Sequence, residues 1–386
     1  MRVRNLVLDV VLGALRIALG LLSEIVTPSR SVVVSGFPET EGNAVETARA
    51  LLHRYPGRVV WLRDAGPVPR EVRELDGLVL VDKASLAGLW AYLRAEAVFF
   101  THGLYGSPRP SRRKPLVNLW HGDGPKDIRP ADRVGAFIPS TYLVGSTSLF
   151  SVFQGSAFGV PAERVLFTGN PRTDQLWRGV DPDHLRPLGI DGPFVVWMPT
   201  FRRARAVGAV RVHEDAQADG GYDTTLGLLL DGLRARGIQL VIKPHPMDAD
   251  RRRWEGAVTV AEEDLVRAGV GLYELLGASA GLVTDYSSVW VDYLLVDRPI
   301  AFLITDRESY DRKLFPADIL DWLPGELVED DRQPFEEFFA DLDADGAHGA
   351  VLRKEVADRI GLNPTRTSAE DLVAALGERG VLRLRS

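Results

Sequence analysis

Polar side chains suited to phosphoryl transfer follow apolar, strand-like runs at five places in the chain. The five segments are His121-Gly122-Asp123-Gly124-Pro125-Lys126, Gly169-Asn170-Pro171-Arg172-Thr173-Asp174, Pro199-Thr200-Phe201-Arg202-Arg203, Lys243-Pro244-His245-Pro246 and Thr284-Asp285-Tyr286-Ser287-Ser288. Cations and hydroxyls around one crevice suit a diphosphate, and a histidine suits proton removal from an attacking alcohol near pH 7. Phosphoryl transfer depends mainly on positioning and charge neutralisation. Together the five segments therefore predict a diphosphate site.

The last of these segments has two interpretations. It follows an apolar run, Gly281 to Val283, and stands at the start of a helical pattern. Paired hydroxyls at a helix start, with free backbone N–H groups and the helix dipole, favour a bound phosphate. An ordinary N-cap at Ser287 or Ser288 explains the same residues. Because the other four segments also place polar side chains after strand-like runs, we favour the phosphate site.

Strand-like and helix-like runs alternate after the N-terminal segment. The predicted strands are Val32–Val34, Val59–Leu62, Ala97–Thr101, Leu116–Trp120, Val165–Phe167, Phe194–Met198, Ile238–Lys243, Gly281–Val283 and Pro299–Ile304. The predicted helices are Asn43–Arg54, Ser85–Ala95, Thr224–Arg236, Tyr273–Leu276, Gly349–Ile360 and Ser368–Gly377. Such alternation implies an α/β fold with doubly wound parallel sheets. Ligands of such sheets lie at the carboxyl ends of the strands, where the five polar segments fall.

The length of 386 residues predicts two domains rather than one core. Residues 174–193 are rich in proline, glycine and charge and are interpreted as a linker zone. The predicted boundaries are an N-terminal helix over 1–28, one Rossmann-like domain over 29–180 and a second over 181–386.

Several function classes are disfavoured by what the sequence lacks. The net charge of −7 argues against a general nucleic-acid binder. The absence of cysteine excludes disulfides, thiolate catalysis and zinc–thiolate sites. There is no GxGxxG or Walker A motif, and no carboxylate cluster has clear metal-ligand spacing. We therefore predict no metal-ligating residues and no cofactor, and the metal requirement of the reaction is left open.

The N-terminal segment 5–26 is almost entirely apolar, and Arg2, Asp9, Arg16 and Ser23 recur every seven residues. On a helix this gives a narrow polar stripe against a wide apolar face. Its charges disfavour a spanning helix, and a signal peptide requires an uncharged core. We predict an amphipathic helix lying in a membrane interface. The alternative is a helix packed in a hydrophobic groove of its own protein or of a partner.

A basic loop follows in segment 103–115, with Arg109, Arg112, Arg113 and Lys114 among prolines. One interpretation is a solvated loop. The other is a patch for anionic lipid head groups or for a phosphorylated acceptor.

Five ordered motifs resemble the CDP-glycerol glycerophosphotransferase family, the teichoic-acid primases and polymerases of bacterial cell walls and related capsule enzymes. They are Trp120-His121-Gly122, Gly169-Asn170-Pro171-Arg172, Pro199-Thr200-Phe201-Arg202, Pro244-His245-Pro246 and Thr284-Asp285-Tyr286-Ser287-Ser288 with Asp292. The resemblance spans roughly 116–310. It implies a GT-B fold, with an interdomain cleft between two Rossmann-type domains, at the cytoplasmic face of the plasma membrane. It also implies transfer of glycerol phosphate from CDP-glycerol to a hydroxyl of a lipid-linked teichoic-acid or capsule precursor, with release of CMP.

The resemblance further implies a role for each matched residue. The catalytic residues would be His121, as base near the acceptor hydroxyl, and His245, stabilising charge in transfer. The substrate-binding residues would be Gly122, Asp123, Gly124, Pro125, Arg172, Pro199, Thr200, Lys243, Pro244, Ser287, Ser288 and Asp292. Of these, Lys243 would contact the diphosphate, the two serines the phosphate, and Asp292 a hydroxyl of CDP-glycerol.

The chain departs from the family where many members have His-Gly-Thr-Pro-Leu-Lys, because Asp123 and Gly124 stand in that loop. Where many members have Arg-Asn-Asp, it has Arg172-Thr173-Asp174. These departures leave open the acceptor and the polyol, glycerol or ribitol. A homo-oligomer is also left open. The alternative functions are a GT-B glycosyltransferase using a nucleotide sugar and a membrane-bound scaffold with a degenerate nucleotide site.

Overall fold

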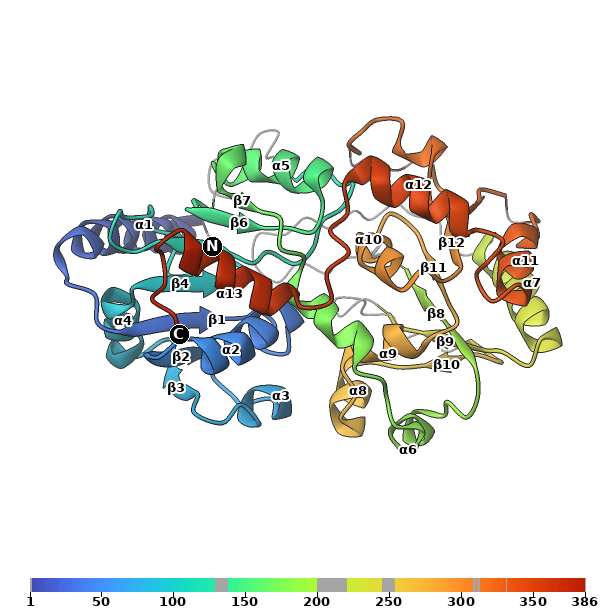
Figure 1. Cartoon of the computed structure of the whole chain (residues 1–386), viewed down its shortest axis with the longest axis horizontal. Coiled ribbons are helices and arrows are strands. Elements are labelled where there is room, and N and C mark those ends of the chain that lie inside the picture. Colours follow the sequence, from blue (N-terminus) through green and yellow to red (C-terminus); the bar gives the residue numbers. More distant parts are fainter. Residues whose placement is uncertain are drawn as a thin grey trace. The chain divides into compact units, whose positions relative to one another are not determined.

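The computed structural model describes residues 2–128, 138–199, 221–244, 254–307, 310, 313–330 and 332–385. The chain divides into two compact units, whose helices and strands are labelled in Figure 1. Unit 1 comprises Met1–Asp123, Ile128–Asp174 and Gly361–Ser386, and unit 2 comprises Gly124–Asp127 and Gln175–Ile360. The predicted second domain, 181–386, differs from unit 2 at its end, since residues 361–386 belong to unit 1.

Unit 1 is built on a parallel sheet with the strand order β3-β2-β1-β4-β5-β6-β7. Its strands are β1 (Ser31–Ser35), β2 (Arg58–Arg63), β3 (Val79–Asp82), β4 (Ala97–Phe100), β5 (Leu116–Asn118), β6 (Tyr142–Val144) and β7 (Val165–Leu166). The central strands β1 and β4 are buried along their whole length, which matches their continuous apolar sequences. The order 3-2-1-4-5-6 is that of a doubly wound Rossmann-type sheet, so the prediction for this unit is confirmed.

The helices of unit 1 cover this sheet on its two faces (Figure 1). They are α1 (Arg2–Ile25), α2 (Gly42–Arg54), α3 (Arg70–Arg73), α4 (Leu86–Arg94), α5 (Ser148–Ala157) and α13 (Ser368–Glu378). Helix α13 packs on α2, and its Leu372, Val373 and Leu376 are fully buried in the same core as Val32 of β1. This apolar face explains why residues 361–386 join unit 1.

The start of α13 is fixed by Asp174, whose carboxylate accepts from the backbone N–H of Ser368 at 2.7 Å and of Ala369 at 3.0 Å. A carboxylate at a helix N-terminus satisfies donors that have no partner within the helix. Burial nevertheless raises the pKa of Asp174 to about 6, against the lowering effect of these two bonds.

Unit 2 repeats the same sheet plan, with the parallel order β10-β9-β8-β11-β12-β13. Its strands are β8 (Phe194–Met198), β9 (Gln239–Ile242), β10 (Val258–Thr259), β11 (Gly281–Thr284), β12 (Ile300–Leu303) and β13 (Glu326–Val328). Its helices are α6 (Pro182–Leu185), α7 (Gly221–Ala235), α8 (Glu262–Ala268), α9 (Leu272–Ala278), α10 (Val289–Tyr293), α11 (Glu336–Asp343) and α12 (Ala350–Ile360). The doubly wound prediction is confirmed for this unit as well.

A buried arginine ties α12 to the rest of unit 2. Arg353 is 2% exposed and forms ion pairs with the carboxylates of Asp341 and Asp297, the latter at 2.7 Å. It also donates to the carbonyl oxygen of Gly346. A buried charge persists only with such partners, because removing them leaves the desolvation cost unopposed.

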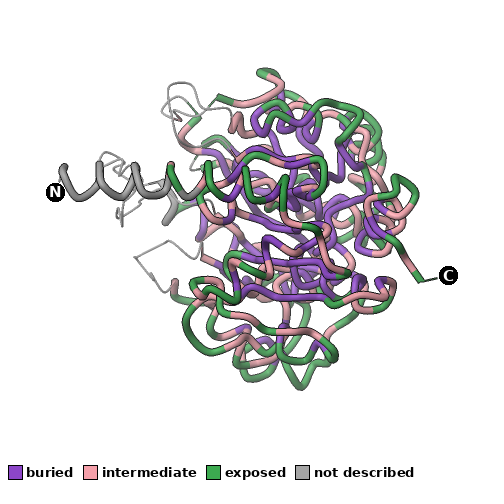
Figure 2. Tube along the Cα trace, turned by 90° about the vertical axis from the view of Figure 1, so that its left-hand side faces the viewer, coloured by how far each residue is buried: buried purple, intermediate pink, exposed green. Residues whose placement is uncertain are grey.

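Helix α1 has one packed side and one exposed side over the part whose side chains are described. Leu19 and Ser23 are buried against unit 1, whereas Ile17, Leu21 and Ile25 are more than 60% exposed. This part of α1 is drawn largely green, for exposed, in Figure 2. In the described part of the chain no helix combines the length and apolarity needed to cross a membrane.

Candidate active site

The carboxyl ends of three neighbouring strands of unit 1 bring a cluster of rings together. Phe37 follows β1, His102 follows β4, and Trp120 and His121 follow β5. The imidazoles of His102 and His121 are stacked, with ring centroids 4.7 Å apart and planes 10° from parallel. Trp120 lies tilted against His121 at 3.7 Å, and Phe37 meets His102 edge-on at 5.4 Å. His121, the predicted base, therefore lies at the strand ends in contact with aromatic side chains.

The backbone that presents His121 is held in an unusual conformation. Trp120 has φ +50°, in the left-handed region, and Gly122 has φ +117°, which favours glycine. The carbonyl oxygen of Trp120 accepts from Asn43 Nδ2 at 3.2 Å, and its N–H donates to Asn118 Oδ1 at 2.9 Å. Backbone conformations of this kind are found at functional sites, where neighbouring contacts maintain them.

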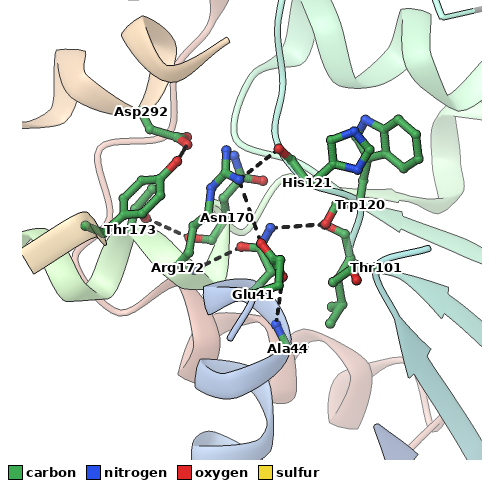
Figure 3. A network of polar contacts seen from close by, with 12 residues as sticks. Glu41, Ala44, Thr101, Trp120, His121, Asn170, Arg172, Thr173 and Asp292 are labelled. Carbon is green, nitrogen blue, oxygen red and sulfur yellow. Dashed lines mark hydrogen bonds and ion pairs between the residues drawn. The ribbon is translucent and has the colours of Figure 1, made fainter. Parts of the chain in front are cut away.

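Arg172 joins the same network (Figure 3). Its guanidinium Nη1 donates to the carbonyl oxygen of His121 at 2.8 Å, and Glu41 Oε1 lies 3.8 Å from the same nitrogen. The backbone N–H of Arg172 donates to Asn43 Oδ1 at 3.0 Å, so Asn43 contacts both segments. Two predicted site residues, His121 and Arg172, are thus brought together, with Arg172 fixing the backbone of His121. Donor binding by Arg172 stays a prediction.

Asp123 is directed into unit 1 and is 2% exposed. Its Oδ2 accepts from the backbone N–H groups of Ser146 and Thr147, both at 2.8 Å. The same oxygen accepts from the hydroxyls of Ser146, Thr147 and Ser151 at 3.2, 3.0 and 2.5 Å. The carboxylate thus holds the turn between β6 and α5 against the residues that follow His121. Contact between Asp123 and substrate stays a prediction, beside this evident structural role.

The next residues of the loop, Gly124–Asp127, belong to unit 2. Pro125 O accepts from the N–H of Phe315 at 2.7 Å, and the N–H of Asp127 donates to the carbonyl oxygen of Lys313 at 2.9 Å. Gly124 lies so close to Ser288 that an added Cβ would come within 2.4 Å of the Ser288 Cβ. Glycine is required at this position because no side chain fits there. Gly124 and Ser288, two predicted substrate-binding residues, are therefore in contact.

In unit 2 the other predicted segments follow the neighbouring strands β9, β8 and β11. Pro199 follows β8, and Thr284 Oγ1 of β11 donates to the carbonyl oxygen of Met198 at 2.9 Å. Ser288 is the N-cap residue of α10 but makes no capping hydrogen bond through its side chain. Ser287 Oγ accepts a long bond, 3.4 Å, from the N–H of Val289. Neither serine is thus a strong N-cap, which leaves the phosphate interpretation open.

Two further predicted residues of unit 2 have buried partners. Lys243 follows β9, its side chain is 2% exposed, and its Nζ pairs with Glu262 at 3.2 Å and donates to Pro244 O at 3.4 Å. Asp292 is 1% exposed and accepts from the hydroxyl of Tyr273 at 2.6 Å. Their predicted contacts with CDP-glycerol are not tested by these bonds. Thr200 and His245 lie outside the described residues.

Sequence reasoning missed three residues of this site: Asn43, Glu41 and His102. The position of His102 directly after the strand Ala97–Phe100 is the same signal that selected His121. Asn43 and Glu41 lie at the start of α2 and carry no motif, so only the fold reveals them. Among the described residues no group of three or more acidic or histidine side chains is arranged to hold a metal ion.

Two doubly wound parallel sheets with polar groups at their strand ends define a Rossmann-type α/β protein. Over residues 42–363 the chain matches the family of CDP-Glycerol:Poly(glycerophosphate) glycerophosphotransferases, and it belongs to that family. The resemblance found in the sequence is confirmed.

Curated relatives of the chain are named for teichoic acid synthesis. The chain is 25% identical over 265 residues to a teichoic acid glycerol-phosphate transferase of Staphylococcus aureus, covering 58% of this chain and 61% of the relative. It is 24% identical over 257 residues to a teichoic acid ribitol-phosphate primase of Bacillus spizizenii, covering 61% and 64%. The chain thus spans less than two thirds of the length of these relatives.

Solved structures share the fold. The wall teichoic acid polymerase TagF superposes with a TM-score of 0.68 at 19% identity, covering 92% of this chain and 90% of that chain. A UDP-GlcNAc 2-epimerase from Neisseria meningitidis bound to UDP-GlcNAc gives 0.54 at 12% identity, covering 90% and 99%. At these identities the likeness concerns the fold alone.

Proposed function

We propose that this protein transfers glycerol phosphate from CDP-glycerol to a hydroxyl of a lipid-linked cell-wall or capsule precursor. The observation that carries the proposal is the presentation of His121. Its side chain is exposed at the end of β5, while Asn43 and Arg172 hold the backbone on either side. This occurs in a chain that belongs to a glycerophosphotransferase family. Its family relatives include enzymes named for teichoic acid synthesis.

In the proposed reaction His121 removes the proton of the acceptor hydroxyl. The acceptor oxygen then forms a bond to the glycerol-bearing phosphorus of CDP-glycerol. The P–O bond between the two phosphorus atoms breaks, and CMP leaves with the bridging oxygen and the electron pair. The proton passes from His121 to solvent. No redox step is involved, and the protein contributes positioning and charge stabilisation.

We propose that the donor is bound by the strand ends of unit 2. Pro199 and Lys243 follow neighbouring strands there, and Ser287 and Ser288 follow β11. Thr200, Pro244, His245 and Asp292 complete the set by family resemblance. Positive charge from Lys243 and hydroxyls from the serines suit a diphosphate.

Ribitol is a second candidate polyol, because a ribitol-phosphate primase is as similar to the chain as the glycerol-phosphate enzymes are. A nucleotide-sugar enzyme is the other candidate, and the fold likeness to the epimerase bound to UDP-GlcNAc favours it. Calorimetry with CDP-glycerol, CDP-ribitol and UDP-GlcNAc separates the three. We expect CDP-glycerol to bind most tightly, and CMP to be released when a lipid-linked disaccharide is added. Tightest binding of UDP-GlcNAc would overturn the proposal.

We also propose that the protein binds the inner surface of the membrane through α1 and the basic loop. Ile17, Leu21 and Ile25 form an exposed apolar stripe at a spacing of four residues, which is one face of a helix. The carbonyl oxygen of Ser23, on the packed side, accepts from Ser111 Oγ at 3.1 Å. This bond fixes the basic loop beside α1. An apolar stripe next to exposed Arg112 and Arg113 suits an anionic lipid surface.

Replacing Ile17, Leu21 and Ile25 together with serine is expected to weaken binding to anionic vesicles by roughly 100-fold or more, because three exposed side chains lose their burial in lipid. Co-sedimentation with vesicles of mixed phosphatidylcholine and phosphatidylserine measures this. Deleting the helix is a poorer test, since Leu19 is part of the core.

The matched variant Arg112→Ala with Arg113→Ala is expected to weaken vesicle binding by roughly 10-fold at low salt and less at high salt. CDP-glycerol binding should be unchanged in both variants. Unaltered vesicle binding by the triple serine variant would contradict a role for α1.

A further inference from the structure

His102 and His121 form a parallel imidazole pair at the ends of two adjacent strands, β4 and β5. With centroids 4.7 Å apart and planes 10° from parallel, the face of one ring covers the face of the other. His121 is exposed, whereas His102 is partly buried beneath it. The sequence motifs of the family include His121 but not His102, so the role of the second imidazole is unassigned.

The ring of His102 is held from two further sides. Its Nδ1 lies 3.3 Å from Thr101 Oγ1, and that hydroxyl already accepts from the N–H of Phe37 at 2.9 Å. The hydroxyl proton is therefore available to Nδ1. The ring of Phe37 meets His102 edge-on. These contacts hold the plane of His102, and through the stack they restrict the plane of His121.

The charged groups around the pair favour a neutral His102. Burial, and then the nearby ammonium of Lys83, lower the pKa of His102. Lys83 itself pairs with Asp64 at 3.4 Å. On the side of His121, Arg172 donates to the carbonyl oxygen of His121, and Glu41 lies beside that arginine.

We propose that His102 is a positioning residue for the base His121: its ring fixes the orientation of the His121 imidazole and supports the positive charge that His121 acquires on taking the acceptor proton. A cation is attracted to the face of a neutral aromatic ring, and we extend this attraction to an imidazolium stacked on a neutral imidazole. Misplacement of a catalytic group by about 1 Å can reduce rates by roughly 100-fold, so orientation matters as much as charge. The proposal rests on the proposed function for its activity readout.

Two substitutions separate the effects of the ring from those of its nitrogens. His102→Phe retains a flat ring that cannot titrate, and His102→Ala removes the ring. His53→Ala is the matched control, because His53 lies on the surface of the same unit with a side chain that is 75% exposed. For each variant the measurements are the pH profile of kcat/KM for CMP release, the Kd for CDP-glycerol, and the titration of His121 followed by NMR of labelled histidine.

His102→Ala is expected to lower kcat/KM by on the order of 10-fold and to leave the Kd for CDP-glycerol unchanged. It should also lower the pKa of His121 in the NMR titration, since the imidazolium loses the ring that supports it. His121 must be neutral to act as a base, so kcat/KM falls as the pH drops through the pKa of His121. The acid limb of the profile should therefore move to lower pH. His102→Phe should recover most of the rate and of the His121 titration.

The proposal is overturned if His102→Ala leaves both the rate and the His121 titration as in the wild type. It is equally overturned if alanine and phenylalanine reduce the rate alike while the His121 titration does not move. The NMR titration requires no turnover. If the wild type releases no CMP, the proposed function fails while the link between His102 and His121 is still decided by that titration.

Discussion

His121→Ala is expected to lower the rate of CMP release from CDP-glycerol by on the order of 10²–10⁴-fold, the usual effect of removing a general base. The side chain is exposed and makes ring contacts to Trp120 and His102. The carbonyl oxygen that binds Arg172 belongs to the backbone and survives the substitution. The loss should therefore appear in kcat, with little change in the Kd for CDP-glycerol or in the melting temperature.

The control for this experiment is again His53→Ala, which should leave the rate within about twofold of the wild type, as expected for an exposed residue away from the site. Steady-state kinetics with a lipid-linked disaccharide and saturating CDP-glycerol provide the measurement. A His121→Ala enzyme with near wild-type kcat would remove His121 from the role of base.

Asp123→Ala is expected to destabilise unit 1 by roughly 3–5 kcal/mol. The buried carboxylate oxygen accepts two backbone N–H groups and three hydroxyls, and alanine leaves these donors without that acceptor. Hydroxyls can turn to other acceptors, but the N–H groups of Ser146 and Thr147 cannot move without the turn. Urea unfolding followed by tryptophan fluorescence measures the loss.

Asp123→Asn keeps the shape and an acceptor oxygen but removes the charge, so its cost should be smaller than that of alanine, on the order of 2 kcal/mol. Asp76→Ala is the matched control: this exposed aspartate of the same unit should change stability by no more than about 0.5 kcal/mol. If Asp123→Ala is as stable as the wild type yet inactive, Asp123 acts on substrate, as the family resemblance implies, and not through the fold.

Most of the fold follows from the sequence because the buried strands are continuous apolar runs. The predictions for β1, β2, β4, β5, β7, β8, β9, β11 and β12 are confirmed to within a few residues. The strands β3, β6, β10 and β13 were missed, and the first two show the physical reasons. β3 alternates between half-buried and exposed residues, and β6 has only three residues, too few for a period to show. Helix α13 was predicted, but its partner was not, since an apolar face does not say which surface it covers.

The site was predictable where it depends on position after a strand, and not where it depends on contacts. His121 and Arg172 were selected by such positions, and the structure brings them together. Asp123 stands in the same loop, yet its carboxylate is directed into the fold. The backbone leading to Asp123 is left-handed at Trp120, a conformation that tryptophan does not signal in a sequence. Asn43 contacts both segments from a helix far away in the sequence, so only the folded chain identifies it.

Helix α13 also determines the order in which the protein can assemble. Residues 361–386 supply Leu372, Val373 and Leu376 to the core of unit 1, but they are synthesised after the whole of unit 2. Unit 1 therefore cannot bury the face of α2 while the ribosome is still making unit 2. The carboxylate of Asp174 likewise has no helix start to accept from until Ser368 and Ala369 have been synthesised. The larger part of unit 1 is synthesised first, but its core is complete only when α13 has been made. Until then the apolar surface of α2 that α13 covers stays exposed on the ribosome.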